Sequence, residues 1–422
     1  MRCAHVATLL IVSASAGAGA QKPPPIRQIG RLERVTTDSL ASVSDALPMP
    51  GGRVLVNDAR GRRVLLFDST LAHPIVVADT TSATAGVYTR GSGGSLFRYR
   101  GDTAIFLDHA GLTMYVIGPA GTIVRVMAFP PPPNSNGGMA TFGRGGVPAF
   151  DARGRLVYFN AAGAGQGTMT QRLGAAVLVD GKPTELHSRN QNTDSAFIIR
   201  ATLATRTFDT VTALHIVKVR RTLKTDAQGS LTSIENTWDP LPVIDEWTML
   251  SDGSIAVVRA RDYHVDWLSA DGHWSSTPKM PFDWQRVSDE RKQALIDSAV
   301  AAWQAGFDRS GRGRGGRPPD GTPPAAPNVA VAPKLADLPD YVPPMEWGER
   351  SVRADADGNL WIRTTTRVGG QPVYDIVNRR GELVDRVQLP SFRTIAGFGP
   401  GVVYMAMIDA ARIVRLERAR LK

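Results

Sequence analysis

The stretch "SDGSIAVVRA", residues 251–260, followed by "YHVDWLSADGHWSS", residues 263–276, decides the fold of this chain. Each half contains a short run of apolar and β-branched residues and a glycine turn, at Gly253 and Gly272. Short alternating apolar runs separated by such turns are typical of antiparallel strands joined by hairpins. We therefore interpret this stretch as one small antiparallel sheet.

The same unit recurs along the chain, with a strand, a glycine turn, a second strand and then a hairpin. The other copies span 49–77, 99–129, 151–187, 356–389 and 399–419. Six units of four antiparallel strands predict an all-β chain folded as a six-bladed β-propeller. No such sheet buries both of its faces alone, so stacking against neighbouring sheets must supply the core.

Two segments complete or interrupt this pattern. The last unit stops after its third strand, and "IGRLERVTT" (29–37) can supply the missing strand and close the ring, which removes a free sheet edge. The third unit is stretched, and "SAFIIRATLATRTFDTVTALHIVKV" (195–219) is interpreted as its outer strands.

Motifs such as "ADADGNLWIRT" (354–364) resemble the blades of the NHL-repeat and gluconolactonase-like (regucalcin-like) group of six-bladed propellers, in an exported bacterial form. The resemblance covers most of residues 29–420. In gluconolactonase-like enzymes a glutamate near the start of an inner strand is a ligand of the catalytic divalent metal, and Glu246 is similar to it in its position within the blade. Such blade motifs specify a fold rather than a function.

The first twenty residues have the features of an export signal. Arg2 is followed by the apolar run "VATLLIVSA" (6–14) and by the small residues Ala18-Gly19-Ala20, which predict cleavage before Gln21. We expect a periplasmic or secreted mature chain, 21–422, with no transmembrane segment, because no later stretch reaches about 20 apolar residues. Cys3 lies within the signal, so the mature chain would have no disulfide.

The net charge of +10 comes mainly from arginine, with 8 lysines among the 49 basic residues. A basic protein can bind nucleic acid or another polyanion. Here the basic residues are scattered, and the densest run is "RSGRGRGGR" (309–317). Together with export, this pattern predicts no nucleic-acid partner.

A helical and Gly/Pro-rich insertion, 283–345, separates the fourth and fifth units. Its first part predicts a helix at 288–307, with Ser288 as N-cap and with apolar residues on one face, namely Leu295, Ile296, Ala299, Val300 and Trp303. Residues 308–333 predict a flexible linker. The insertion joins an outer strand to the next inner strand, so it should lie on the channel-mouth face, either as a lid or as a rim packed on the propeller.

Propeller geometry also predicts which polar residues gather at the channel mouth. They are those that start inner strands or follow second strands: Asp45, Asn57, Asp58, His109, Glu246, Arg259, Arg261, Asp262, Tyr263, His264 and Arg363. Glu246, Asp262 and His264 are candidate ligands for a divalent metal, calcium or zinc. Arg259 and Arg261 could instead grip a carboxylate or phosphate, and a polar rim is also what solubility alone requires.

These features leave open two main functions at the same mouth. One is a non-catalytic binding or scaffold propeller that recognises a small molecule, a glycan or a protein. The alternative is a divalent-metal-dependent, lactonase-like hydrolase, in which the metal would polarise a carbonyl and activate water. A third interpretation is a sensor or ligand-carrying module for a membrane partner. The sequence contains no serine nucleophile elbow, His-x-x-x-His pair or phosphate loop.

Overall fold

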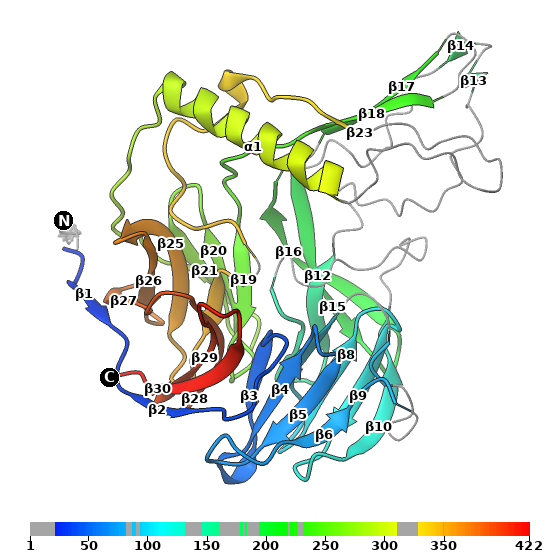
Figure 1. Cartoon of the computed structure of the whole chain (residues 1–422), viewed down its shortest axis with the longest axis vertical. Helices are drawn as coiled ribbons and strands as arrows, with labels where there is room; N and C mark the ends of the chain where they lie inside the picture. The colour runs from blue at the N-terminus through cyan, green and yellow to red at the C-terminus, as the bar shows by residue number, and fades with distance from the viewer. Residues whose placement is uncertain are drawn as a thin grey trace, which may run out of the picture.

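The computed structural model of this chain forms a ring of small antiparallel sheets, with a helix above one side of the ring (Figure 1). It describes residues 22–81, 87–89, 93–130, 146–160, 178–179, 182–183, 194–217, 220–226, 231–309, 328–348 and 350–422. The predicted signal peptide, 1–20, lies outside the described residues, and so does most of the predicted linker, 308–333.

Six sheets of the described chain form the blades, which confirms the six-bladed β-propeller, and in blades 1 to 4 the four strands follow chain order from the centre outward. Blade 1 contains β3 (Asp45–Pro48), β4 (Val54–Asp58), β5 (Arg63–Phe67) and β6 (Ile75–Ala78). Blade 2 contains β7 (Gly94–Arg98), β8 (Ala104–Asp108), β9 (Thr113–Ile117) and β10 (Ile123–Ala128). Blade 3 contains β11 (Ala149–Phe150), β12 (Leu156–Asn160), β15 (Ser195–Thr202) and β16 (Thr207–His215).

Residues 251–276 form the greater part of blade 4. This blade contains β19 (Glu246–Met249), β20 (Ile255–Arg259), β21 (His264–Leu268) and β22 (Trp274–Ser276). Blade 5 contains β24 (Val352–Ala354), β25 (Leu360–Val368), β26 (Gln371–Val377) and β27 (Leu383–Gln388). Blade 6 contains β28 (Arg393–Gly399), β29 (Val402–Ile408) and β30 (Val414–Arg420).

The N-terminal segment closes the ring, as the sequence predicts. Strand β2 (Leu32–Val35) pairs antiparallel with β30 and becomes the outer strand of blade 6. The preceding strand β1 (Ile26–Gln28), which the repeat pattern did not predict, pairs parallel with β27 and extends blade 5. Strand β2 therefore completes the four-stranded sheet of blade 6.

The core lies between the blades rather than within them. A cluster of buried apolar residues fills each interface between neighbouring blades of the described chain. Trp247 anchors the interface of blades 3 and 4, and Trp361 that of blades 5 and 6; both are fully buried. The inner strands approach so closely that a Cβ on Gly397 of β28 would lie 1.9 Å from the Ala46 carbonyl of β3, so only glycine fits there.

The third blade departs from the simple repeat. Its outer strands are β15 and β16, which confirms the interpretation of 195–219 as those strands. The assignment of 175–187 as a hairpin of the third unit was wrong. Its described residues form a separate two-stranded sheet, β13 (Leu178–Val179) and β14 (Lys182–Pro183). Short apolar runs carry no signal for which neighbour they pair with, which explains the error.

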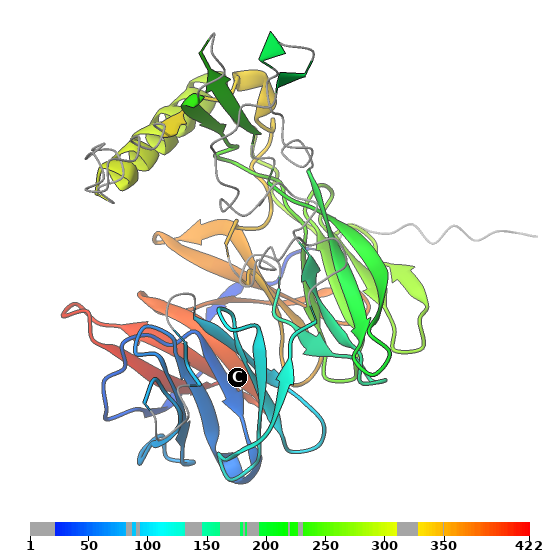
Figure 2. The same cartoon turned by 90° about the vertical axis from the view of Figure 1, so that its right-hand side faces the viewer.

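A second structural unit stands above the mouth face, and we call it the cap (Figures 1 and 2). It comprises β17 (Arg220–Thr225), β18 (Leu231–Thr237), α1 (Asp289–Arg309), β23 (Asn328–Ala330) and the short helix η3 (Leu335–Asp337). Strand β18, from the connection between blades 3 and 4, pairs parallel with β23, from the connection between blades 4 and 5. Two separate connections thus build one cap.

Helix α1 begins where the sequence predicts it. Ser288 caps it by accepting the backbone N–H of Arg291 on its hydroxyl at 3.3 Å. Ile296 and Lys292 are buried, and Trp303 packs on Trp238 with ring centroids 5.9 Å apart. No helix among the described residues is long and apolar enough to cross a bilayer.

Candidate functional site

Four charged side chains gather where inner strands begin, and we call them the channel cluster: Asp45, Glu246, Arg350 and Arg353. Asp45 starts β3 and Glu246 starts β19, while Arg350 and Arg353 lie at the start of β24. The Arg350 guanidinium donates to both carboxylate oxygens of Asp45, with Nη2 3.2 Å from Oδ2, and to the Ser44 carbonyl at 2.6 Å. This ion pair links the segment before blade 5 to the first strand of blade 1. In the ring, blade 6 lies between these two blades.

Glu246 is the least solvated member of this cluster. Its side chain is buried, and the hydrogen bond it makes within the described residues is from the backbone N–H of Trp247 to Oε1, at 3.2 Å. Burial raises the pKa of Glu246 to about 8, and the Trp247 N–H and the charge of Arg350 only partly oppose this rise. Glu246 is therefore mainly a neutral carboxylic acid at pH 7.

The predicted metal ligands are not brought together. Glu246 starts the innermost strand of blade 4, whereas His264 starts the third strand, β21, and Asp262 precedes it. Two strand spacings, about 10 Å, separate the first strand of a blade from the third. The His264 Nδ1 lies 3.8 Å from Asp262 Oδ2, and Nε2 lies 3.2 Å from Asp266 Oδ1. Among the described residues, no group of three or more metal-binding side chains is arranged around a common point.

Arg259 is the centre of an ion-pair network, so its guanidinium is not free to bind an anionic ligand. Its Nε donates to Asp266 at 2.7 Å, and its Nη1 donates to Asp245 at 2.8 Å and to the Ala213 carbonyl of blade 3 at 2.8 Å. Asp245 also accepts the backbone N–H of His215 at 3.0 Å. This network ties the outer strand of blade 3 to blade 4.

Three predicted mouth residues, Asn57, Asp58 and His109, turn into the protein. Asp58 is buried, accepts the backbone N–H groups of residues 41, 42 and 61, and pairs with Arg63 at 2.9 Å. The amide of Asn57 donates to the carbonyl of residue 94 at 2.7 Å, and His109 Nε2 lies 2.9 Å from the Ser95 hydroxyl. These contacts brace the mouth loops.

Tyr263 and Arg363 also have partners within the fold. Tyr263 is fully buried in the core between blades 4 and 5, and its hydroxyl donates to Asp375. Arg363 pairs with Glu346 at 2.6 Å, which fastens the segment returning from the cap onto β25. Both residues therefore position backbone segments at the mouth.

Arg261 lies in a different setting, a cavity of about 420 Å³ between the cap and the propeller, which we call the cap cavity. Its propeller side includes His215 from β16 and Ala260 and Arg261 after β20. Its other side includes Asp337 of η3 in the cap, together with Trp284 and the segment Leu338–Tyr341 from the connections between the cap and the propeller. Arg261 is exposed and has no hydrogen-bond or ion-pair partner among the described residues, so its guanidinium is available to a ligand.

Aromatic rings form one wall of the cap cavity. Trp284 and Tyr341 are 39% and 48% exposed, and their ring centroids lie 6.5 Å apart at 88°. Phe282 packs edge-on against Trp284 at 5.2 Å and against the buried Tyr263 at 5.7 Å. A chain of edge-to-face contacts thus runs from the blade core to the cavity wall and holds the two exposed rings in place.

Carboxylates supply most of the charge around the cap cavity. Asp194, Asp239, Asp337 and Asp340 line it together with Arg261. Burial raises the pKa of Asp239, and so does the charge of Asp337, while nearby His215 opposes the rise. Asp340 pairs with the buried Lys292 of α1 at 2.8 Å. The lining therefore offers several hydrogen-bond acceptors beside two aromatic faces.

The sequence predicted Arg261 and placed the insertion 283–345, which contains Trp284, on the mouth face, but Tyr341, Asp239 and His215 were not predicted as site residues. The predicted residues all start inner strands or follow second strands within a blade. The missed residues lie at the end of an outer strand or in the connections that lead to and from the cap. A search for polar and aromatic residues within those two connections would have found them.

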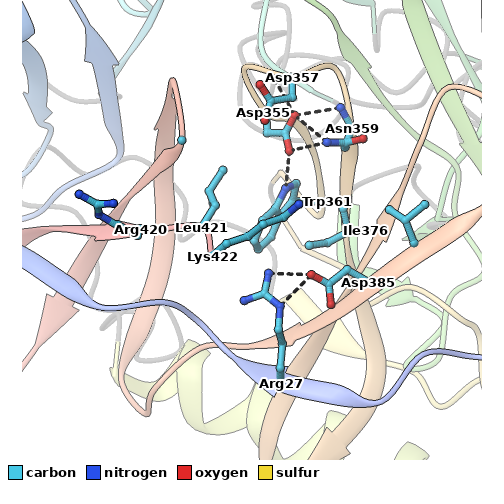
Figure 3. Close-up of a pocket in the computed structure, with 12 residues that line it drawn as sticks. Arg27, Asp355, Asp357, Asn359, Trp361, Ile376, Asp385, Arg420, Leu421 and Lys422 are labelled. Atoms are coloured by element: carbon cyan, nitrogen blue, oxygen red, sulfur yellow. Dashed lines mark hydrogen bonds and ion pairs between the residues drawn. The ribbon is translucent and has the colours of Figure 1, made fainter.

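A further cavity of about 390 Å³ lies on the opposite face, between blades 5 and 6 (Figure 3). Its main polar groups bind one another: Arg27 of β1 pairs with Asp385 at 2.6 Å, and Asp355 accepts the Trp361 indole N–H at 3.1 Å. These bonds fasten β1 to blade 5 and hold the inner turn of that blade. The polar groups of this cavity therefore have a structural role.

The blades and the cap together define the chain as a capped six-bladed β-propeller. Its structure is similar to that of a catalytically inactive virginiamycin B lyase from Staphylococcus aureus, with 11% identity, 92% of this chain and 98% of that chain covered, and a TM-score of 0.40. Regucalcin, a calcium-binding protein from Agrobacterium tumefaciens, gives 11% identity, 94% and 97% coverage, and a TM-score of 0.39.

A Bacteroides fragilis protein described as exported gives 8% identity, 94% coverage of both chains and a TM-score of 0.43. No protein-family model matches the sequence, and no curated protein sequence matches it. These similarities concern the fold alone.

Proposed function

We propose that this chain is an exported, non-catalytic binding protein whose ligand occupies the cap cavity. The observation that supports this function is the cavity itself, about 420 Å³ in volume, with one side from the propeller and one from the cap. Cavities of this size between two structural units are common sites for small organic ligands. The insertion 283–345 would then serve as one wall of the site.

The lining favours a ligand that carries hydrogen-bond donors and one apolar face. Carboxylates such as Asp239 accept hydrogen bonds from hydroxyl or ammonium groups, and Trp284 and Tyr341 offer faces for stacking. Sugars and organic amines share this chemistry. Arg261 would bind an acceptor at the other end of the same ligand. A partner of this kind is a small molecule or a glycan end, not a nucleic acid.

The lactonase-like alternative has less support, because its candidate ligands Glu246, Asp262 and His264 lie in separate parts of blade 4. Arg259, which could have held an anionic substrate, is already bound to two carboxylates. The cap cavity does not depend on any of these groups. Binding without catalysis is therefore the function with the more direct structural support.

Saturation-transfer NMR with glucosamine, N-acetylglucosamine and spermidine tests the proposal. Transfer to at least one probe is expected with the wild-type chain, and Trp284→Ala should abolish it because half of the aromatic wall is lost. Trp274→Ala is the matched control, since Trp274 is 46% exposed on the outer strand β22 and does not belong to the cavity lining. Unchanged transfer in Trp284→Ala would contradict the assigned site, and no transfer to any probe would contradict the ligand chemistry.

Salt separates the two ligand classes in the same experiment. A cationic probe held by Asp239 and Asp337 should bind several-fold more weakly at 0.5 M than at 0.05 M sodium chloride, because salt screens exposed charges. A neutral sugar should bind about equally at both concentrations. Glucosamine and N-acetylglucosamine differ in this charge and provide the direct comparison.

A further inference from the structure

Arg353 lies in the channel wall with few partners for its charge. Its Nη1 donates to the Ala396 carbonyl of β28 at 3.3 Å, and most of its five N–H donors have no acceptor among the described residues. Desolvation lowers the pKa of Arg353 to about 10, helped by the charge of Arg350 and opposed by Asp45 and Tyr374. The guanidinium is therefore charged at neutral pH, and its side chain remains partly exposed.

Arg350, next to it, is also incompletely bonded. Its two Nη groups are used by Asp45 and by the carbonyl of Ser44, but its Nε is buried and has no partner in the described chain. The backbone of Arg350 has a φ of +63°, a conformation that costs energy for any residue with a side chain. This backbone strain is the energetic cost of the position in which Arg350 reaches the mouth.

The charges of the channel cluster do not balance. Arg350 pairs with Asp45, whereas Arg353 bonds to a backbone carbonyl, and burial raises the pKa of Glu246, which favours its uncharged form. The neighbouring group beyond Tyr374 has the same imbalance, since Arg363 and Arg367 share the single carboxylate of Glu346. An unpaired charge held away from bulk water is costly, and a bound counter-ion removes that cost.

We propose that the channel mouth binds a small oxyanion, of the carboxylate, sulfate or phosphate class, between Arg353 and Arg350. A guanidinium presents parallel N–H donors that match two oxygens of one anion. The carboxyl group of Glu246 lies near enough to Arg350 to feel its charge, and in its protonated form it would donate its O–H to the anion. This site is separate from the cap cavity, and neither proposal depends on the other.

Isothermal titration of the full mature chain with sodium sulfate, and separately with sodium acetate, in Tris chloride buffer at pH 7 tests this site. One saturable site per chain is expected for at least one of the two anions. Arg353→Gln should weaken that binding at least tenfold, because the free guanidinium is lost. Arg393→Gln is the matched control, since Arg393 is a partly buried arginine already paired with Glu417 at 2.7 Å, and it should bind the anion like the wild type.

Arg353→Lys covers the case in which the glutamine variant does not fold. It keeps the positive charge but loses the forked donors, so at least tenfold weaker binding is again expected. The absence of a saturable heat with both anions would overturn the proposal. Wild-type affinity in either Arg353 variant would overturn it as well.

The pH dependence provides a second readout that a structural role for Arg353 would not produce. Ionisation of Glu246 above about pH 8 places a negative charge beside the anion. Wild-type affinity should therefore fall about tenfold between pH 7 and pH 9, whereas in Glu246→Gln it should stay constant, by linkage of proton and anion binding. Equal pH dependence in both chains would contradict the placement of the anion beside Glu246.

Discussion

The hydroxyl of Tyr263 donates a hydrogen bond to Oδ2 of Asp375, 2.8 Å away, across the interface between blades 4 and 5. Tyr263 sits at a φ of +51° in the turn between β20 and β21, and Asp375 also accepts the Arg386 Nε at 3.1 Å. By sequence position, Tyr263 is one of the polar residues predicted to line the channel mouth. The tyrosine is instead the point at which this turn is fixed to the next blade.

Tyr263→Phe should lower the free energy of unfolding by about 1–3 kcal/mol, since it leaves Asp375 buried with one donor fewer. Urea unfolding followed by circular dichroism measures the change. Tyr341→Phe is the control, because Tyr341 is 48% exposed, and its effect should remain within about 0.5 kcal/mol. Equal losses in the two variants would show that the bond to Asp375 contributes nothing.

Glu246 should make the stability of this protein depend on pH. Its pKa is about 8 in the folded chain and near 4.5 when unfolded, so between these values the folded state holds the additional proton. The free energy of unfolding should then fall as pH rises from 5 to 8, by up to about 1.4 kcal/mol per pH unit from this group.

Glu246→Gln removes that contribution, so its stability relative to wild type should increase steadily from pH 5 to pH 8. Urea unfolding at pH 5, 6.5 and 8 measures the difference between the two chains. Glu382→Gln is the control, because the pKa of the exposed Glu382 is lowered and the group does not titrate in this window. A difference independent of pH would mean that Glu246 is ionised in the fold.

The two N-terminal strands should contribute very differently to stability. Removing residues 22–28 takes away β1 and the Arg27–Asp385 pair, and the expected loss is about 1–2 kcal/mol because the ring remains closed. Removing residues 22–35 also takes away β2 and leaves β30 as an open edge. The longer truncation should unfold at much lower urea with a broader transition, and similar midpoints for both would contradict closure by β2.

Export with cleavage after Ala20 should be visible in the mass of the purified protein. Expression of the full chain in a Gram-negative host followed by periplasmic extraction should yield a species that begins at Gln21. Intact-mass spectrometry measures this directly. A chain that retains residues 1–20 and stays in the cytoplasmic fraction would contradict the signal peptide.

The fold was predictable because it repeats. A glycine turn such as Gly253 carries little information alone, but its recurrence at matching places with apolar alternation determines the number and the order of the strands. Strand β1 has no such support, since three residues with no alternation contain no pattern to recognise. The β18–β23 pair escaped prediction for another reason, because it joins two distant connections.

The site was less predictable because a strand position does not determine where a side chain points or what it meets. Arg259 and Asp58 were correctly placed at strand ends, yet both are saturated by neighbours that come from other strands or loops. Arg261 is three-dimensionally close to Tyr341 and His215 only because the cap folds back over blade 4. Such proximity depends on the tertiary structure, and a single sequence contains no direct signal of which distant residues lie close together.

The closure of blade 6 has a consequence for the order in which the molecule can form. The backbone N–H of Leu416 donates to the Thr36 hydroxyl, a contact that spans 380 positions of the chain. Blade 1 or blade 2 can form from its own stretch of residues as soon as that stretch is available, whereas blade 6 needs both ends of the molecule. During synthesis β2 must therefore wait for β30, and blade 6 is complete only once the residues of β30 have emerged.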